Sequence, residues 1–524
     1  MAAFWLLLLF VVTAVWVLRT WTGRRFGKKA RQPATYPPGL RPYPLIGHLP
    51  QFLANRHRVL DWMTEAVARQ PTCTFVLRRP GGVRGVITAN PANVEHFLRA
   101  SFDNYPKGPR FASLLHDFLG RGIFNADGDA WRAQRKVASY EFNTRSLRAF
   151  VARCVHTELH GRLLPLLQRT AASGGSLDLQ DALERFAFDN ICRVAFDHDP
   201  RQLPDEGDDA GKDVDGTGGS RFADAFRDAA NLSAGRFRYA VPAFWKVKKS
   251  LNVGSERRLR ESIAMVHDFA DRIIRARREG MTSTGCEKHD LLSRFMASQD
   301  ESYSESGVPL RDVVISFLLA GRETTSSALT WFFWLLSSRP DVQRRIRDEV
   351  AAVRARRPQG DLRNVVGFDL DELREMHYVH AAITESMRLY PPVPFNALRA
   401  EADDVLPDGT AVRAGWFVAY NSYAMGRMKF VWGDDALEYR PERWLDPADG
   451  SFRPDSPFRF VAFHAGPRLC LGKEMAYIQM KSIVACVLEE LDMAVDGAYR
   501  PQQVASLTLR MRGGLPVTVK SRRD

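Results

Sequence analysis

Phe463-His464-Ala465-Gly466-Pro467-Arg468-Leu469-Cys470-Leu471-Gly472 is the stretch of this chain that decides the fold. A phosphate-binding loop needs four residues between its glycines and a Ser or Thr after its Lys. Here five residues separate Gly466 from Gly472, and Glu474 follows Lys473, so a phosphate loop is excluded. The alternative is a cysteine on a Gly-rich loop that enters a helix at Lys473. First-turn N–H groups and the helix dipole stabilise a thiolate in that position.

The same stretch matches in full the Phe-x-x-Gly-x-Arg-x-Cys-x-Gly signature of the cytochrome P450 family, the haem-thiolate monooxygenases. It therefore resembles the cysteine-ligand loop of that family. The resemblance implies that Cys470 is the axial ligand of the haem iron, and that Phe463, Arg468 and Gly472 belong to the cofactor site. A thiolate ligand pushes electron density onto the iron and favours O–O cleavage.

Two further motifs occur in the order that the family shows. Glu385-Ser386-Met387-Arg388 matches its Glu-x-x-Arg, and Pro441-Glu442-Arg443-Trp444 follows, with Trp444 where Phe is usual. Alone, a Glu-x-x-Arg pair is a common surface pair on a helix and contributes little. The resemblance implies a buried structural network of Glu385, Arg388 and Arg443. Removing one partner of such a network leaves a buried charge uncompensated, which costs on the order of 3–5 kcal/mol.

The motif Ala320-Gly321-Arg322-Glu323-Thr324-Thr325 lies inside an otherwise apolar helix. A polar patch on a half-exposed helix is one interpretation, but an acid beside two hydroxyls is costly in such a helix unless it faces a wet cavity. The family places an acid–alcohol pair over the distal face of the haem, where it relays protons to dioxygen. The resemblance thus makes Glu323 and Thr324 the catalytic pair. Some animal fatty-acid hydroxylases carry at the position of Ala320 a Glu that links to haem, so Ala320 predicts a non-covalent haem b.

Trp131 and Arg135 are one helical turn apart and share a face. The family uses such a pair to hydrogen-bond a haem propionate. By position, Arg399 and Arg468 resemble the other propionate donors. For each Arg taken singly, a solvated surface charge is the alternative.

Composition excludes several classes of protein. The chain has 524 residues, of which 45% are hydrophobic and 26% charged, which rules out a disordered polyelectrolyte. Its six cysteines form no close CxxC pair, which excludes a disulfide scaffold and a zinc finger. The net charge is +13, yet basic and aromatic residues do not alternate along one face, so nucleic acid is not an expected partner.

The amino end predicts a membrane anchor. Residues Ala2 to Leu18 carry no charge, and the basic residues that follow begin at Arg19. Because the charge lies only after the apolar run, an uncleaved signal-anchor is favoured over a cleaved signal peptide, with the large domain in the cytosol. We expect a transmembrane signal-anchor at 1–22, a basic, Pro-rich hinge at 23–45 and a haem-thiolate catalytic domain at 46–524. The expected location is the endoplasmic reticulum membrane, with lipid as a partner.

The rest of the chain predicts one large, mostly helical domain with small β-sheets (α+β), and the resemblance implies the cytochrome P450 fold. Two hairpins are expected, Thr72 to Arg79 with Val83 to Thr88, and Leu507 to Arg512 with Leu515 to Lys520. Helix-period stretches are Leu147 to Leu167, Leu177 to Phe196, Glu256 to Glu279, Arg311 to Ser338 and Pro340 to Arg356. The acidic, Gly-rich segment Pro204 to Ser220 is expected to be an exposed loop.

Two longer sequence segments resemble the plant fatty-acid ω-hydroxylases. They are Ala320 to Trp334 and Pro391-Pro392-Val393-Pro394-Phe395-Asn396. The resemblance implies oxidation of fatty acids at or near the ω end, and relatives oxidise jasmonate–amino acid conjugates; both substrates are amphipathic carboxylates. The expected substrate channel comprises Lys107 and Arg110 at a carboxylate, and Phe111, Leu114, Phe118, Phe317, Ala320, Val393 and Phe395 along an alkyl chain.

The chain has no complete G-x-G-x-x-G after a strand and no flavin motif, so NADPH must act through a separate NADPH–cytochrome P450 reductase. Arg132, Lys136 and Lys473 suggest a basic face that attracts the reductase. One rival function is a haem-thiolate isomerase or dehydratase of hydroperoxides. Another is a non-catalytic haem-binding or sterol-binding membrane protein. Intact Glu323 and Thr324 count against both.

Overall fold

The computed structural model describes residues 40–80, 83–142, 145–203, 219–239, 243–284, 290–297, 307–357 and 367–522. Residues Pro42–Asp524 form one compact unit, which is considered by itself. The expected anchor (1–22), most of the hinge (23–45) and nearly all of segment 204–220 lie outside the described residues. Within the described ranges, no helix combines the length and apolar character needed to cross a membrane.

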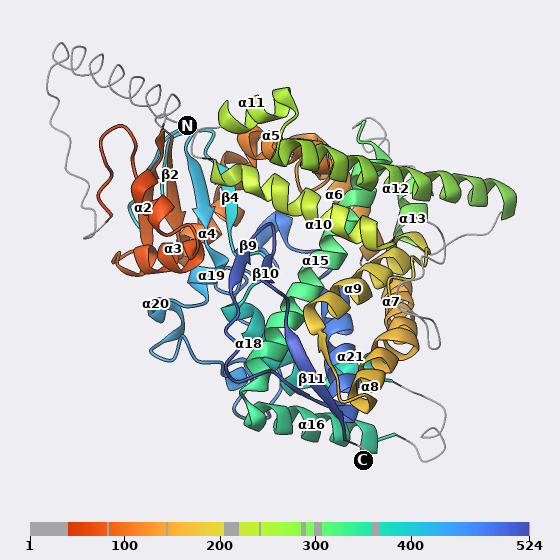
Figure 1. Cartoon of the computed structure of the whole chain (residues 1–524). Coiled ribbons are helices and arrows are strands. Elements are labelled where there is room, and N and C mark those ends of the chain that lie inside the picture. The colour runs from red at the N-terminus through yellow and green to blue at the C-terminus, as the bar shows by residue number, and fades with distance from the viewer. Residues whose placement is uncertain are drawn as a thin grey trace, which may run out of the picture. The chain divides into compact units, whose positions relative to one another are not determined.

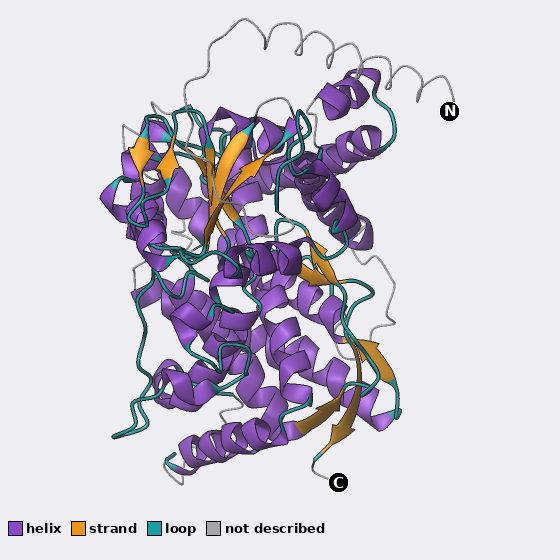
Figure 2. Ribbon diagram, turned by 90° about the vertical axis from the view of Figure 1, so that its left-hand side faces the viewer, coloured by secondary structure: helices purple, strands orange, loops and turns teal. Residues whose placement is uncertain are grey.

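Helices make up most of the described unit (Figures 1 and 2). The helices are α2 (Leu49–Ala54), α3 (Val59–Ala68), α4 (Pro91–Glu95), α5 (Gly108–Leu119), α6 (Gly128–Phe142), α7 (Arg145–Glu158), α8 (Leu164–Ala172), α9 (Leu179–Phe196), α10 (Gly219–Gly235), α11 (Ala243–Leu251), α12 (Ser255–Thr284), α13 (Leu291–Ala297), α15 (Leu310–Ser337), α16 (Pro340–Ala355), α17 (Leu370–Glu375), α18 (His377–Leu389), α19 (Ser422–Met425), α20 (Lys429–Trp432) and α21 (Lys473–Glu490). Short π or 3-10 turns are η2 (His96–Ala100), η3 (Phe102–Asn104), η4 (Leu159–Leu163), η5 (Arg236–Arg238), η6 (Pro441–Trp444) and η7 (Gly466–Arg468).

The strands are few and short, as expected for a mostly α fold. They are β1 (Thr74–Arg78), β2 (Arg84–Thr88), β3 (Ser176–Asp178), β4 (Asn396–Arg399), β5 (Asp404–Val405), β6 (Ala411–Val412), β7 (Phe417–Tyr420), β8 (Leu491–Ala494), β9 (Gln503–Ala505), β10 (Leu509–Met511) and β11 (Pro516–Ser521). The largest sheet has the order β1-β2-β7-β4.

The helix-period stretches are confirmed with small shifts at their ends. Leu147 to Leu167 is helical throughout, from α7 through η4 into α8. The stretch predicted from Leu177 becomes helix only at Leu179, because its first residues belong to β3. There the Asp178 side chain accepts the Gln180 N–H at 2.9 Å and caps α9.

Helix α15 is the centre of the core and contacts α9, α12, α18 and α21. Apolar side chains surround it on nearly all sides, which identifies a buried helix rather than a surface one. Two of its polar side chains fix its register: Ser327 Oγ and Trp331 Nε1 both donate to the Leu509 carbonyl, at 2.6 and 3.0 Å. The Trp331 ring also stacks on Tyr390, with centroids 4.2 Å apart. Helix α15 is therefore joined to the carboxyl-terminal strands and to the end of α18.

The first predicted hairpin is confirmed. Strands β1 and β2 pair antiparallel from Thr74 opposite Thr88 to Arg78 opposite Arg84. Most side chains of this pair are buried, including four consecutive residues of β2 from Gly85 to Thr88, so a change of register would disturb the core.

The second predicted hairpin is wrong. Strand β10 pairs with β9, and β11 pairs with β3 and β8 instead. Gly513 and Gly514 lie between them with φ of +80° and +77°, a conformation that favours glycine. A Cβ on Gly514 would lie 1.8 Å from the Asp178 carboxylate, which also accepts the Leu515 N–H. These long-range contacts override the local turn signal.

A buried carboxylate joins α18 to the segment that precedes the cysteine loop. Glu385 is fully buried and accepts two hydrogen bonds of 2.7 Å from Arg388 and one of 2.8 Å from Trp444 Nε1. Arg443 Nε reaches the same carboxylate at 3.5 Å. The structure thus brings the three expected residues together. Trp444 adds a donor that the usual Phe lacks.

We expect Glu385→Gln to lower the free energy of unfolding by roughly 3–5 kcal/mol, because it leaves the Arg388 charge buried and uncompensated. Urea titration of the haem-bound protein measures this. Glu261→Gln is the control, since the pair of Glu261 with Arg257 is more than half exposed and should contribute below about 1 kcal/mol. Equal losses in the two variants would contradict a special role for the buried pair.

Candidate functional site

The cysteine loop is held by one backbone hydrogen bond and one glycine. Cys470 N–H donates to the Phe463 carbonyl at 2.8 Å and closes the loop. Gly466 has φ +62°, and a Cβ there would lie 1.9 Å from the Leu98 carbonyl oxygen of η2. No other residue fits this close approach. Cys470 is therefore fixed two residues before Gly472, the N-cap of α21.

The pKa of the Cys470 thiol is raised overall, although nearby charges favour its ionised form. Burial raises the pKa of this thiol, whereas the Gly472 N–H and the positive charges of Arg135 and Lys473 lower it. Cys470 is half-buried, unlike the fully buried Cys73, Cys154, Cys192 and Cys486. Among the described cysteines it is thus the one with both access and a positive environment, which a metal-binding thiolate needs.

A basic cluster lies beside this loop. Arg468 Nη2 donates to Asp127 Oδ1 at 2.6 Å, and its guanidinium lies 4.5 Å from the Trp131 ring centroid. Arg135 lies close enough for its charge to lower the pKa of both Cys470 and Arg468. The structure therefore brings Trp131, Arg135 and Arg468 together, as the spacing of Trp131 and Arg135 predicts.

Lys107 belongs to this cluster as well, which its sequence position did not indicate. Its backbone N–H donates to Asp127 at 2.9 Å. Burial, followed by the charge of Arg468, lowers the pKa of its amine to about 7. The same two cations, after burial, lower the pKa of His464 to about 3. Several cations thus share one described carboxylate, Asp127, which leaves an excess of positive charge.

The excess charge has the features of an anion site. Arg468 Nε is buried and has no hydrogen-bond partner among the described residues, and buried donors of this kind are normally satisfied. Arg399 borders the cluster: its N–H donates to the Pro106 carbonyl, and its side chain would meet a Cβ on Gly108. The Arg399 guanidinium itself lies 3.6 Å from Glu401.

One stripe of α15 is half exposed within an otherwise buried helix. Leu319, Ala320, Gly321 and Thr324 form it. Thr324 Oγ1 donates to the Ala320 carbonyl at 2.7 Å, so its hydroxyl is held in the groove of the helix. Phe142 links this region to the cysteine loop, since it touches Phe317 of α15 and faces Gly472. The stripe therefore has the small and polar residues of a distal wall.

Glu323 does not share the stripe. Its side chain is 4% exposed and binds Arg322 on one oxygen, while Thr508 Oγ1 donates to the other at 3.3 Å. Arg322 also contacts Glu184 of α9 at 3.4 Å. The acid and the alcohol of the expected pair thus occupy different faces of α15.

The expected channel residues have different surroundings. Phe111 is half-buried and packs on Phe237 at 5.5 Å, whereas Phe118 is fully buried against Phe226 at 5.3 Å. The other positions also divide by burial: Arg110, Ala320, Val393 and Phe395 are half-buried, and Leu114 and Phe317 are buried.

Sequence reasoning missed three contributors to these sites. Asp127 balances Arg468, Glu184 binds Arg322, and Tyr420 lies 2.7 Å from His464 Nδ1 through its hydroxyl. His464 lies in the quoted loop and offered a signal. Asp127 and Glu184 offered none, because Arg468 and Arg322, the partners that define their roles, lie 341 and 138 residues away along the chain.

Comparison with known proteins agrees with the geometry. A sequence model of the cytochrome P450 family matches residues 37–512. Cytochrome P450 CYP94D108 of Paris polyphylla is 52% identical over 91% of both chains. Cytochrome P450 94A1 of Vicia sativa is 45% identical over 92% of this chain and 90% of its own. Cytochrome P450 94B3 of Arabidopsis thaliana is 44% identical over 99% and 97%.

The residues present fit haem b. Cys470 would supply the thiolate ligand, and Arg135, Lys107 and Arg468 would supply cations for the two propionates, where the buried Arg468 Nε has no partner among the described residues. When bound, such a haem supplies the activation of dioxygen.

Cys470→Ser should abolish the red-shifted reduced-CO band and all turnover, because a serine hydroxyl does not ionise near neutral pH and cannot replace the thiolate. The CO difference spectrum of the reduced protein measures this.

Cys154→Ala is the control, since Cys154 is a buried core cysteine of α7 and should keep the band. Retention of the band in Cys470→Ser would refute the ligand assignment.

Proposed function

The chain belongs to the cytochrome P450 family, and from this premise we propose that it hydroxylates fatty acids at or near their ω end. The enzyme is a haem-thiolate monooxygenase. Its overall reaction converts RH, O₂, two electrons and two protons into ROH and H₂O. The electrons come from a separate reductase.

The observation that supports an acidic substrate is a pair of cations, Arg79 and Arg110. Arg79 directly follows β1 and donates to the Tyr239 carbonyl, just beyond η5, at 2.7 Å. Burial, followed by the nearby charge of Arg110, lowers the pKa of Arg79 to about 10. Neither guanidinium has an ion-pair partner in the part of the chain that the structure describes. Two close, uncompensated cations favour an anion between them, and Arg binds carboxylates well.

An apolar wall adjoins this pair. Phe111, one residue after Arg110, packs on Phe237 of η5 at 5.5 Å. Burial of each CH₂ of an alkyl chain contributes about 0.8 kcal/mol. A carboxylate at Arg79 and Arg110 with its chain along Phe111 directs the far end inward, toward the half-exposed stripe of α15. Oxidation at the ω end then follows from geometry rather than from C–H bond strength.

Lys107 and Arg110 have different proposed roles, although both were expected to meet the carboxylate. Lys107 responds electrostatically to Arg468 and Asp127, beside the cysteine loop. We therefore assign it to the haem propionates. Arg110 interacts with Arg79 and remains the candidate for the substrate head group.

The remaining assignments are also proposals. We propose that 1–22 anchors the protein in the endoplasmic reticulum membrane through the hinge 23–45, with 46–524 as a cytosolic catalytic domain. Lys473, beside the thiolate loop, is the better candidate for meeting NADPH–cytochrome P450 reductase. Arg132 is already paired with Asp103 and Asp129, at 3.1 and 3.0 Å.

The alternative substrate is a jasmonate–amino acid conjugate, which is also an amphipathic carboxylate. A panel of C12–C18 fatty acids and jasmonoyl-isoleucine, assayed with reductase and read by mass spectrometry, separates the two. We expect turnover of the fatty acids. Turnover of the conjugate alone would overturn the proposal in favour of the alternative.

Arg110→Met should weaken laurate binding by about 10- to 100-fold, since a charge-assisted hydrogen bond contributes roughly 1.5–3 kcal/mol. Titration of the substrate-induced absorbance change measures this. Dodecanol, which has no carboxylate, should bind the variant and the parent within about twofold. Lys107→Met should lower haem content instead; unchanged haem with weaker laurate binding in that variant would exchange the two roles.

Phe395→Ala should move hydroxylation inward along laurate and leave haem content intact. Phe395 is half-buried, and its removal widens the channel if it lines the far end. Product regiochemistry measures this. Phe118→Leu is the control, because Phe118 packs in the core against Phe226, and its product pattern should stay unchanged.

A further inference from the structure

Proton supply to Glu323 poses a physical problem. Each turnover consumes two protons, yet Glu323 is 4% exposed and cannot exchange directly with bulk water. A carboxylate that passes on a proton has to recover one before it acts again. The surroundings of Glu323 therefore need a connection to solvent.

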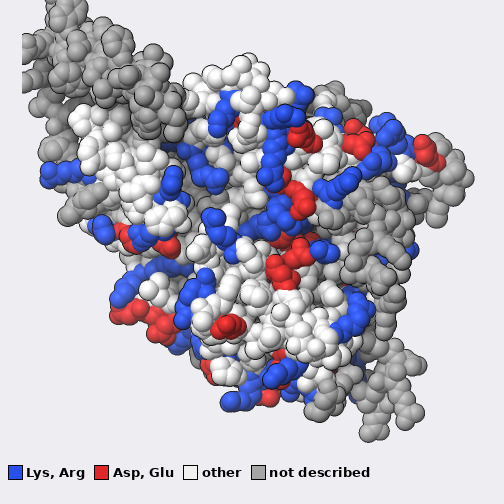
Figure 3. Space-filling model, viewed as in Figure 1, with Lys and Arg blue, Asp and Glu red and all other residues white. Residues whose placement is uncertain are grey.

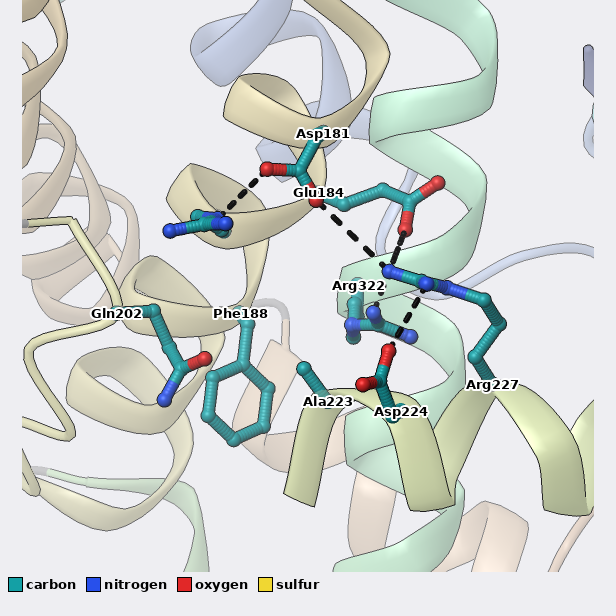
Figure 4. A pocket seen from close by; sticks show the side chains of 9 residues that line it. Asp181, Glu184, Phe188, Gln202, Ala223, Asp224, Arg227 and Arg322 are labelled. Atoms are coloured by element: carbon teal, nitrogen blue, oxygen red, sulfur yellow. Dashed lines mark hydrogen bonds and ion pairs between the residues drawn. The ribbon is translucent and has the colours of Figure 1, made fainter. Parts of the chain in front are cut away.

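A small polar pocket lies beside Arg322, the α15 residue that binds Glu323 (Figure 4). It is lined by Asp181, Glu184, Arg185, Phe188, Gln202, Ala223, Asp224, Arg227 and Arg322. Its volume of about 40 Å³ holds roughly three waters, at about 10–15 Å³ of this measure for each. Helices α9, α10 and α15 contribute these residues.

Exposure falls steadily from the mouth of the pocket to its inner end. The Asp224 side chain is 66% exposed and Arg227 31%, whereas Glu184 is 2% and Arg322 1% exposed. On the face shown in Figure 3, acidic and basic side chains lie interspersed over α9 and α10. The mouth is therefore wet, and the inner end meets the buried network of Glu323.

One guanidinium joins the two buried acids. Arg322 binds Glu323 through Nη1 and Glu184 Oε2 through Nη2, the latter at 3.4 Å. Arg510 of β10 binds the other oxygen of Glu184, and Arg227 approaches Oε2 at 3.5 Å. Glu184 therefore touches both the pocket and the residue that holds Glu323.

Water is needed to complete the hydrogen bonding at this end. The Nε atoms of Arg227, Arg322 and Arg510 are buried and lack a partner among the described residues. Buried polar groups without protein partners are usually satisfied by ordered water. These unpartnered donors, together with the free volume, indicate a hydrated pocket that reaches Glu184.

We propose that this pocket is the route by which protons reach Glu323, and that Glu184 is the ionisable group that carries them at its inner end. A hydrated proton in the pocket protonates the Glu184 carboxylate. The Glu184 O–H then passes a proton through water to Glu323, which releases its own to the distal side. One proton enters for each one delivered, and the route runs twice in each turnover.

The chemistry of the neighbours agrees with this assignment. Arginine stays protonated and cannot relay a proton itself, so Arg322 can only hold the two acids. Burial raises the pKa of Glu184, and the charge of Glu323 raises it further, against the arginines. Burial and the Glu323 charge thus favour the protonated form of Glu184.

Glu184→Gln in the full-length haem protein tests the proposal, because Gln keeps the shape but cannot ionise. With reductase and NADPH, we expect product per NADPH to fall about tenfold and the D₂O solvent isotope effect to rise. Haem content, the reduced-CO band and substrate affinity should stay unchanged. Hydroxylation driven by added hydrogen peroxide, which brings its own protons, should stay within about twofold of the parent.

Glu158→Gln is the matched control. Glu158 is an equally buried carboxylate, but it is shared by Arg162 and Arg193, so its loss should leave coupling unchanged. Ala223→Met fills the pocket without changing a charge and should reproduce the defect of Glu184→Gln. This second variant decides the matter if Glu184→Gln fails to bind haem.

The proposal is overturned if Glu184→Gln forms as much product per NADPH as the parent and shows the same D₂O isotope effect. If Glu184→Gln lacks haem, the same result in Ala223→Met overturns it. The inference rests on the proposed function for its substrate and on the expected role of Glu323 as a proton relay. The assay uses whichever carboxylate of the panel the parent hydroxylates. A parent that ignores every fatty acid refutes the proposed function, whereas an active parent with an equally coupled variant refutes the proton route.

Discussion

The buried carboxylate of Glu385 is the interaction on which the cysteine loop depends. Its partner Arg388 also donates to the carbonyls of Ala436 and Glu438, at 2.7 and 2.9 Å. Trp444, which hydrogen-bonds to Glu385, packs on Phe460 at 5.0 Å, and Phe460 approaches Phe463 at 6.5 Å. Since the Phe463 carbonyl accepts the Cys470 N–H, one buried ion pair and three aromatic rings connect α18 to the thiolate.

The buried charges of this protein differ in how they are balanced. Around Glu385, Arg388 and their neighbours, cations and acid are saturated with hydrogen bonds, which makes the network rigid. Around Arg468, several cations share Asp127, so the site is completed by an added anion such as a haem propionate. Around Arg322 the charges are balanced, but the hydrogen bonds are incomplete and imply water. The same residue types thus support structure, cofactor binding or proton supply. Which role they take depends on whether charges or hydrogen-bond donors are left without a partner in the protein.

Helix α15 separates two functions by its geometry. Adjacent residues of an α-helix project about 100° apart. Thr324 therefore lies on the half-exposed stripe with Ala320, while Glu323 turns toward Arg322 and the side of Glu184. A carboxylate held in this way is shielded from bulk water, and the proposed route connects it to solvent through the polar pocket. The arrangement keeps bulk water from the reacting face without isolating it from protons.

Features encoded locally could be predicted from the sequence. The Gly466-to-Cys470 spacing, the start of a helix at Lys473 and the 3.6-residue period of α12, α15 and α16 depend on near neighbours, so the cysteine loop and the long helices were predicted correctly. The hairpin between β1 and β2 was also predicted, because its strands are adjacent along the chain. The relation of Trp131 to Arg135 follows from one helical turn.

Tertiary structure alone decided what depends on distant partners. Gly513 and Gly514 carry a turn signal, yet β11 pairs with β3 and β8 because burial of its face against them outweighs a local turn. The sequence predicts Lys107 at the substrate carboxylate, but the structure places it in the basic cluster of Arg468. Glu184 has no motif at all: its role comes from Arg322, 138 residues away in the chain. Sequence determines which groups can ionise, whereas packing decides which of them are buried together and left for water or cofactor to complete.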